Sequence, residues 1–173
     1  DEHPRVREAA LDQMVRVGYI PAVIDGVDDQ RLRQKWARLK IPEMIESEDV
    51  ASIAELCMDP SASMRKIITE NLDNIDWLGW SAVVDAAKQS ADNLLLPRLL
   101  RSKRGKVADD LRLELLQQAD DVVRVRVLEH LHGRVVSSSI ASILPSLSED
   151  ENPLVAQAAL SLIKDTETLG TEV

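Results

Sequence analysis

One short motif recurs along the chain, and its spacing restricts the possible folds more than any other feature. An acidic residue is followed six positions later by an arginine, which has an apolar residue before it, in "DEHPRVR", "DPSASMR" and "DDVVRVR". The apolar residue beside this arginine, or its equivalent in weaker copies, recurs in steps of 26, 32, 32, 29 and 30 residues. These markers are Val6, Leu32, Met64, Leu96, Val125 and Val155. A period near thirty residues is too short for a domain and predicts repeated pairs of helices.

The composition also favours helices. Hydrophobic residues make up 45% of the 173 residues but aromatic residues only 2%, so a core must consist of Leu, Val, Ile and Ala. Six glycines are too few for a protein rich in tight turns between strands. Two apolar stripes with steps of three and four residues are predicted to face a core. They are Val6, Ala9, Ala10 and Met14, and Met64, Ile67, Ile68 and Leu72.

The array is expected to occupy residues 1–165, followed by a polar, frayed tail at 166–173. Its units are placed at roughly 1–17, 18–45, 46–73, 74–105, 106–134 and 135–165. The helices that partner the arginine-bearing ones are expected near 18–27, 47–58, 76–91, 107–119 and 136–148. The segment "LKIPEMIESED" is longer than a simple turn, and an irregular connection is expected there.

The repeated segments resemble the HEAT repeat family over essentially the whole chain. "DEHPRVREAAL" matches the family's second helix closely, whereas "DENPLVAQAAL" lacks the arginine, and the second and fourth copies differ in spacing or contain a proline. The resemblance implies an all-α fold, an α-solenoid of about five to six HEAT-like helix pairs. It also implies that the recurring acid and arginine link adjacent repeats as a structural ladder. The ladder residues would be Asp1, Arg7, Asp59, Arg65, Asp120 and Arg126.

The charge of the chain bears on its partners. Asp and Glu number 30 against 21 Lys and Arg, a formal charge of -9, which disfavours nucleic acid. The segment "RLLRSKRGK" departs from this average. It is a candidate docking patch for an acidic protein surface or for phosphate, or else a solvated helix end whose cations complement the helix dipole. Its cations are Arg98, Arg101, Lys103, Arg104 and Lys106.

Other candidate sites are few. Trp36 lies on the second arginine-bearing helix and would be a binding anchor if it were exposed. His130 and His132 lie two residues apart on an expected helix, so they point in different directions and do not form a metal site. The single Cys57 lies in an apolar run and is expected to be a small buried hydrophobe. We expect no metal and no cofactor, because the sequence has no glycine-rich phosphate loop, nucleophile elbow or zinc motif.

These features favour a noncatalytic protein–protein interaction scaffold or regulatory module with a protein partner. The family also contains alkylpurine DNA glycosylases and phycobilin lyases, so an enzyme on the same fold is one alternative. Nucleic-acid binding through residues 98–106 is another. By the resemblance, the arginine-bearing helices would line a concave wall and turn Arg5, Glu8 and Asp12 toward the partner. Exposed repeat ends could also join two copies. The absence of a long apolar segment or a signal peptide favours a cytoplasmic location without membrane contact.

Overall fold

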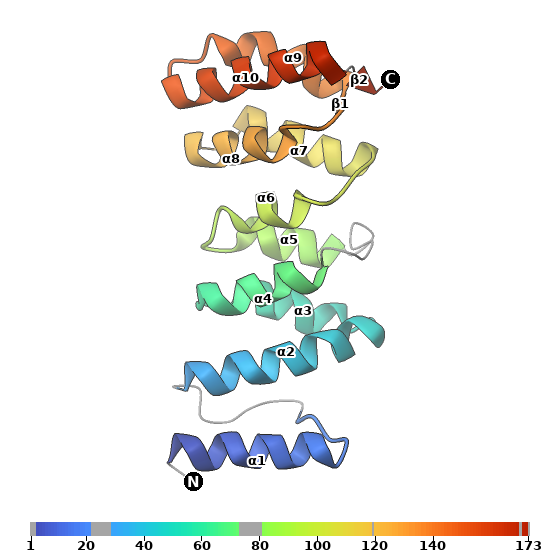
Figure 1. The fold of residues 1–173 in the computed structure, drawn as a ribbon, viewed down its shortest axis with the longest axis vertical. Coiled ribbons are helices and arrows are strands. Elements are labelled where there is room, and N and C mark those ends of the chain that lie inside the picture. The colour runs from blue at the N-terminus through green and yellow to red at the C-terminus, as the bar shows by residue number, and fades with distance from the viewer. Residues whose placement is uncertain (1–2, 22–28, 73–80, 119, 170, 173) are drawn as a thin grey trace. The chain divides into compact units, whose positions relative to one another are not determined.

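The computed structural model describes the chain except for residues 1–2, 22–28, 73–80, 119, 170 and 173. Within the described residues the fold is all-α, with ten helices and one pair of two-residue strands (Figure 1). The all-α class predicted from the sequence is therefore confirmed. The chain divides into two compact units, Asp1–Asp92 and Asn93–Val173.

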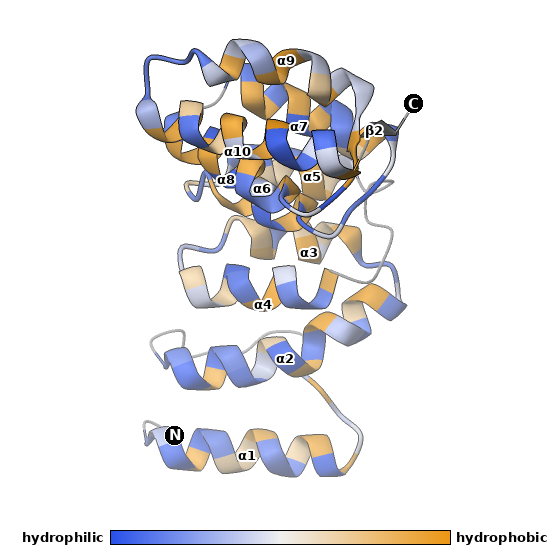
Figure 2. Cartoon of the chain, turned by 45° about the horizontal axis from the view of Figure 1, so that its top comes forward, coloured by the Kyte–Doolittle hydropathy of each residue, from blue (hydrophilic) through white to orange (hydrophobic). Residues whose placement is uncertain are grey.

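The described residues of the first unit form five helices in two layers. They are α1 (Pro4–Arg16), α2 (Gln30–Glu46), α3 (Val50–Cys57), α4 (Ala62–Leu72) and α5 (Ser81–Gln89). Helix α2 packs between α1 and α4, and α3 packs against α5 and also against α2 and α4. Polar and apolar positions recur turn by turn along α2 and α4 (Figure 2). The two layers therefore bury their apolar positions against each other.

The second unit repeats this arrangement. Its elements are α6 (Leu95–Leu100), α7 (Lys106–Gln118), α8 (Asp121–Leu131), β1 (Val136–Ser137), α9 (Ser138–Ser148), α10 (Pro153–Leu169) and β2 (Thr171–Glu172). Helix α7 packs against α9 and α8 against α10, while α7 and α8, and α9 and α10, form sequential pairs. The two short strands pair in parallel. The core of this unit is formed by Leu116, Val123, Val127, Leu128, Leu131, Val136, Ile140, Leu144, Leu147, Val155, Ala159 and Leu162.

One predicted apolar stripe is confirmed and the other is wrong. The four residues of the α4 stripe, from Met64 to Leu72, are all buried. In α1 the only buried residue is Leu11, whereas Val6 and Met14 are 47% and 41% exposed. Arg7 and Leu11 lie one turn apart on the side of α1 that contacts α2, so this side, and not the predicted stripe, faces the neighbouring helix.

Acidic residues begin several helices, as expected for N-caps. The Asp29 carboxylate accepts hydrogen bonds from the backbone N–H groups of Arg31 and Leu32 at the start of α2. Asp49 and Asp120 cap α3 and α8 in the same way. Each of these carboxylates satisfies a backbone donor that the helix leaves unpaired, and its charge faces the positive end of the helix dipole.

Three local expectations differ from the structure. Helix α2 continues through Pro42 to Glu46, where an irregular connection was expected, because Ile41 and Met44 on either side of the proline are buried. Residues 18–21 of the expected helix at 18–27 are not helical, and the rest lies outside the described residues. At the other end, α10 continues to Leu169, past the expected end of the array at residue 165. None of the helices in the described ranges is both long and apolar enough to span a bilayer.

Candidate interaction surface

Four arginines each form an ion pair with an acidic residue 22 to 27 positions further along the chain. The pairs are Arg7–Asp29 (Nη2 to Oδ2, 3.9 Å), Arg33–Asp59, Arg65–Asp92 (Nε to Oδ2, 3.1 Å) and Arg124–Asp150 (Nη1 to Oδ2, 2.5 Å). Each arginine is the fourth residue of its helix, in α1, α2, α4 and α8 respectively. The recurring element is therefore a position within the helix, one turn inside its N-terminus.

In the first unit these contacts form a continuous chain. Asp59 accepts the ion pair from Arg33, and its backbone carbonyl oxygen accepts a hydrogen bond from Nη1 of Arg65 at 2.6 Å. Arg65 then reaches Asp92, so one acid contacts the arginines of both neighbouring helices. The side chains of Arg65 and Asp92 are only 11% and 10% exposed. Partly buried charges of this kind stabilise the fold only while they remain paired.

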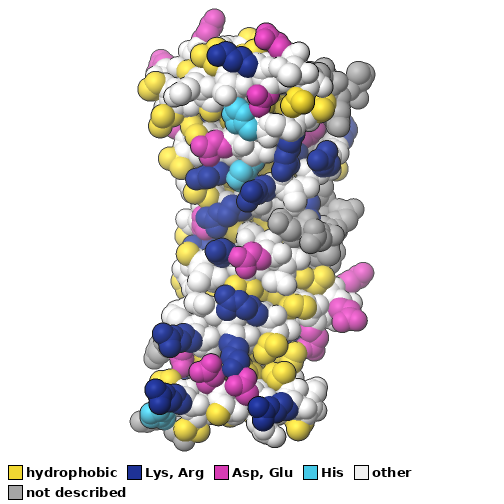
Figure 3. Space-filling view, viewed as in Figure 1, with side chains coloured by type: hydrophobic (Ala, Val, Ile, Leu, Met, Phe, Trp, Pro, Cys, Tyr) yellow, Lys and Arg dark blue, Asp and Glu magenta, His cyan; other side chains and the backbone are white. Residues whose placement is uncertain are grey.

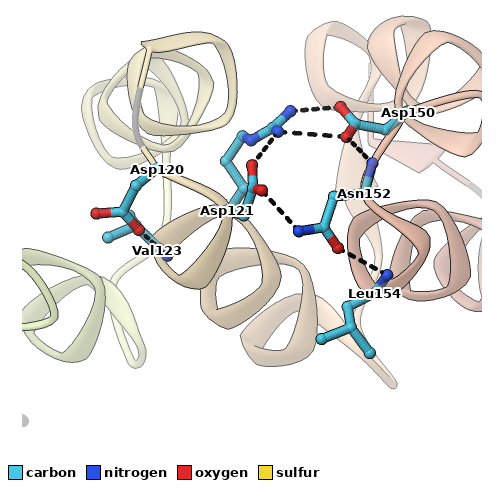
Figure 4. Close-up of polar contacts among 7 residues, drawn as sticks. Asp120, Asp121, Val123, Asp150, Asn152 and Leu154 are labelled. Carbon is cyan, nitrogen blue, oxygen red and sulfur yellow. Dashed lines mark hydrogen bonds and ion pairs between the residues drawn. The ribbon is translucent and has the colours of Figure 1, made fainter.

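In the second unit Arg124 is the centre of a denser network (Figure 4). Its guanidinium donates to both carboxylate oxygens of Asp150, at 2.5 and 3.3 Å, and also to Asp121. Asn152 joins the two acids, because its side-chain amide donates to Asp121 at 2.6 Å and its backbone N–H donates to Asp150 at 2.9 Å. Hydrogen bonds from Arg124 are the main reason that the pKa values of Asp121 and Asp150 are lowered.

The assignment of Arg126 to the ladder is wrong, and the structure gives this contact to Arg124. Arg126 is 47% exposed and pairs with Glu129 of its own helix at 3.3 Å. Asp59 lies three positions before the first residue of α4, whereas Asp120 lies only one position before the first residue of α8. A count of six residues from the acid therefore reaches the fourth residue of α4 but the sixth residue of α8, two positions beyond Arg124. Asp120 instead caps α8 and accepts a hydrogen bond from the Asn93 amide at 2.7 Å. The expected role of Asp1 lies outside the described residues.

The five cations of the segment 98–106 do not form one surface. Lys103 is only 7% exposed, and the Lys106 side chain pairs with Asp110 at 2.8 Å. Arg98 is half-buried as the fourth residue of α6. Arg101 and Arg104 are exposed. The predicted docking patch is therefore reduced to the arginines of the loop that follows α6.

Two further arginines, not identified from the sequence, hold the end of α6. Arg112 of α7 is 5% exposed, and its Nη2 donates to the carbonyl oxygens of Leu100, at 2.7 Å, and of Lys103. Arg134, in the turn after α8, donates from Nη1 to the carbonyl oxygen of Arg101. Carbonyl groups at a helix C-terminus lack helical partners, and these guanidinium groups supply them.

The two histidines near this loop have separate contacts. Nδ1 of His130 lies 3.2 Å from the carbonyl oxygen of Pro97, and Nδ1 of His132 lies 2.8 Å from Asp165. Burial is the main cause of a lowered pKa for His130, and the nearby Arg101 and Arg126 lower it further. Among the residues that the structure describes, no three His, Cys, Asp or Glu side chains are grouped to hold a metal ion.

The remaining candidate binding residues are engaged within the chain. Nε1 of Trp36 donates to the carbonyl oxygen of Pro21 at 2.7 Å, and the side chain is half-buried, so it is not an exposed anchor. Lys35 of α2 pairs with Asp12 at 2.5 Å and with Glu8 at 3.5 Å. Two of the three α1 residues expected to face a partner therefore link α1 to α2.

An open groove of about 390 Å³ lies between α3 and α5. Its lining residues are Ala51, Ala54, Glu55, Met58, Ala82, Asp85, Ala86 and Gln89. Four of these residues are alanines, and the lining includes no cation and no nucleophile.

Comparisons of the chain with protein-family models, with curated proteins and with solved structures give no match. The function is therefore inferred from the contacts of the chain's own residues.

Proposed function

We propose that the chain is an α-solenoid of HEAT-like repeats and that its function is noncatalytic binding of a protein partner. The observation that carries the proposal is the ion pair that recurs one turn inside α1, α2, α4 and α8, as in Arg33–Asp59 and Arg65–Asp92. A contact that recurs at the same position in four helices favours a repeated helix pair over a single closed core.

The packing within each unit supports the same proposal. Helices α2 and α4 lie in one layer and α3 and α5 in the other, and α8 and α10, and α7 and α9, follow the same order. Within each unit, a helix pair then packs mainly on the pair next to it and leaves its other faces exposed. Repeat proteins use such faces for recognition.

The ionisable side chains favour binding over chemistry. The lowered pKa values of Asp121, Asp150 and Asp165 are the opposite of what a general acid at neutral pH requires. Burial raises the pKa of Cys57 to about 11, so this thiol is a poor nucleophile. In catalytic sites such shifts bring a pKa toward the working pH, whereas these move away from it.

The experiment that tests the proposal is affinity capture from native-host lysate with and without nuclease, followed by mass spectrometry. An immobilised, unrelated protein of similar size and net charge is the control for ionic adsorption. We expect a discrete protein that is absent from the control and survives nuclease. Recovery that is lost with nuclease would favour nucleic-acid binding, and no enrichment over the control would refute the proposed function.

A further inference from the structure

Four arginines from three segments of the second unit lie near one another: Arg101 and Arg126 both lie near His130, and Arg134 lies near Arg101 and Arg104. Arg101 and Arg104 come from the loop after α6, Arg126 from α8 and Arg134 from the turn after α8. Helix α6 packs against both α7 and α8, which brings these segments together. Lysine and arginine side chains surround a histidine in the upper half of Figure 3. We call these four side chains the arginine patch.

The local folding explains why two of them project outward. The guanidinium groups of Arg112 and Arg134 bind the backbone carbonyl groups of the loop, so they hold its backbone against the rest of the unit. The side chains of Arg101 and Arg104 remain exposed, with no ion pair to any residue that the structure describes. Arg126 is 47% exposed and has one partner, Glu129.

The gathered positive charges perturb one another. Burial lowers the pKa of Arg134, and the neighbouring charges of Arg112, Arg104 and Arg101 lower it further. Residues 98–134 contain nine Lys and Arg against six Asp and Glu, in a chain where acids outnumber cations. An anion at the arginine patch would relieve this repulsion.

We propose that the arginine patch binds a short acidic segment, a run of Asp and Glu, in the protein partner. The guanidinium fork matches a carboxylate in geometry and in charge, so an extended run of carboxylates suits several exposed arginines. This inference rests on the proposed function and specifies the chemistry of its partner.

A nucleic acid fits the same surface less well. Strong binding to nucleic acid needs many phosphate contacts along an extended basic surface. The segment 135–173 instead has six Asp and Glu against one Lys, and the whole chain carries a formal charge of -9. A single small anion is also disfavoured, because the exposed arginines Arg101, Arg104 and Arg126 come from two separate segments and offer more positive charge than one such ion would neutralise. A short acidic segment satisfies the patch without extending onto the acidic surface.

The test measures fluorescence anisotropy of a labelled peptide of alternating Asp and Glu, titrated with the chain at low salt. A peptide of alternating Asn and Gln, and a short single-stranded DNA, are the comparison ligands. The principal variant is Arg101→Glu with Arg104→Glu, and Arg101→Gln with Arg104→Gln is a milder version of it. Lys66→Glu is the matched control, because this lysine is 71% exposed and lies in the first unit.

We expect the acidic peptide to bind, the neutral peptide not to bind, and added salt to weaken the interaction. Either double variant should lower the affinity by about tenfold or more, while Lys66→Glu changes it by about twofold or less. Equal affinity in the double variants and the control, absent binding of the acidic peptide, or tighter binding of DNA would overturn the proposal. If the double variants still capture the lysate partner, the arginine patch is excluded as its site and the proposed function stands.

Discussion

Substituting Arg124 with alanine should destabilise the protein, whereas the same substitution at Arg126 should not. Both residues lie in α8, two positions apart, so helix propensity changes equally in the two variants. They differ in their contacts, because Arg124 binds Asp150 and Asp121 and is 17% exposed, whereas Arg126 has one exposed partner. The pair of variants compares the contacts of Arg124, to Asp150 before α10 and to Asp121 in α8, with the single exposed pair of Arg126.

The expected magnitude follows from the burial of Arg124. Exposed ion pairs contribute about 0.2–1 kcal/mol, and breaking a buried one costs about 3–5 kcal/mol, so a side chain at 17% exposure should lie between, near 2 kcal/mol. For a chain of this size about 1 kcal/mol shifts the melting temperature by about 2–4 °C. Arg124→Ala should therefore lower Tm by about 4–8 °C. Arg126→Ala loses only a pair worth about 0.3–0.5 kcal/mol, which alanine's helix propensity partly offsets.

The assay is thermal unfolding followed by circular dichroism at 222 nm, at neutral pH and moderate salt. Arg124→Lys is an informative third variant, because it keeps the charge but cannot contact Asp150 and Asp121 through one planar fork, so it should recover only part of the loss. Equal shifts for Arg124→Ala and Arg126→Ala would show that the ion pair with Asp150 has no special structural weight. The ladder interpretation of α8 would then be rejected.

Three other outcomes are expected. Arg65→Ala should lower the free energy of unfolding by about 2–3 kcal/mol in urea titrations, because it removes the ion pair between Arg65 and Asp92, whose side chains are both poorly solvated; a loss below about 0.5 kcal/mol would contradict this. Since Asp121 and Asp150 have lowered pKa values, their stabilising effect is present above about pH 4 and is lost as the pH falls through their folded-state values. Urea titrations at neutral and acidic pH should show a smaller acid loss in Arg124→Ala than in the original chain; equal losses would refute this cause. Cys57 should resist a thiol reagent at mildly alkaline pH until denaturant is added, and rapid labelling of the folded chain would show that it is accessible.

The helices could be predicted from the sequence because their evidence is local. The stripe from Met64 to Leu72 has helical spacing and is buried in α4. The equivalent stripe in α1 is just as regular, yet Val6 and Met14 are exposed. Periodicity identifies the apolar side of a helix, but which side becomes buried depends on the neighbouring helices. For α1, the described neighbour α2 contacts the side that carries Arg7 and Leu11.

The arginine contacts were predicted in part, and the error at α8 has a simple geometric cause. The distance from acid to arginine along the sequence includes the loop before the helix, whose length varies between repeats. The distance from the first helical residue to the arginine does not vary among Arg7, Arg33, Arg65 and Arg124. A search aligned on helix starts, marked by caps such as Asp29 and Asp120, would have selected Arg33 and Arg124.

The basic segment shows why charge along the sequence is a poor guide to charge on a surface. Lys103 lies in the middle of the run and is buried, whereas Arg134, 31 residues further on, reaches the same loop and binds its backbone. Three arginines of the arginine patch remain exposed: Arg101 and Arg104 in the loop after α6, and Arg126 in α8. These two segments lie together because α6 packs against α8. Reversing the charge of Lys103 would introduce an anion at a buried site and unfold the loop, and any loss of binding would then have two explanations. Reversing Arg101 and Arg104 changes only exposed side chains, so a loss of binding with an unchanged Tm can be attributed to the surface itself.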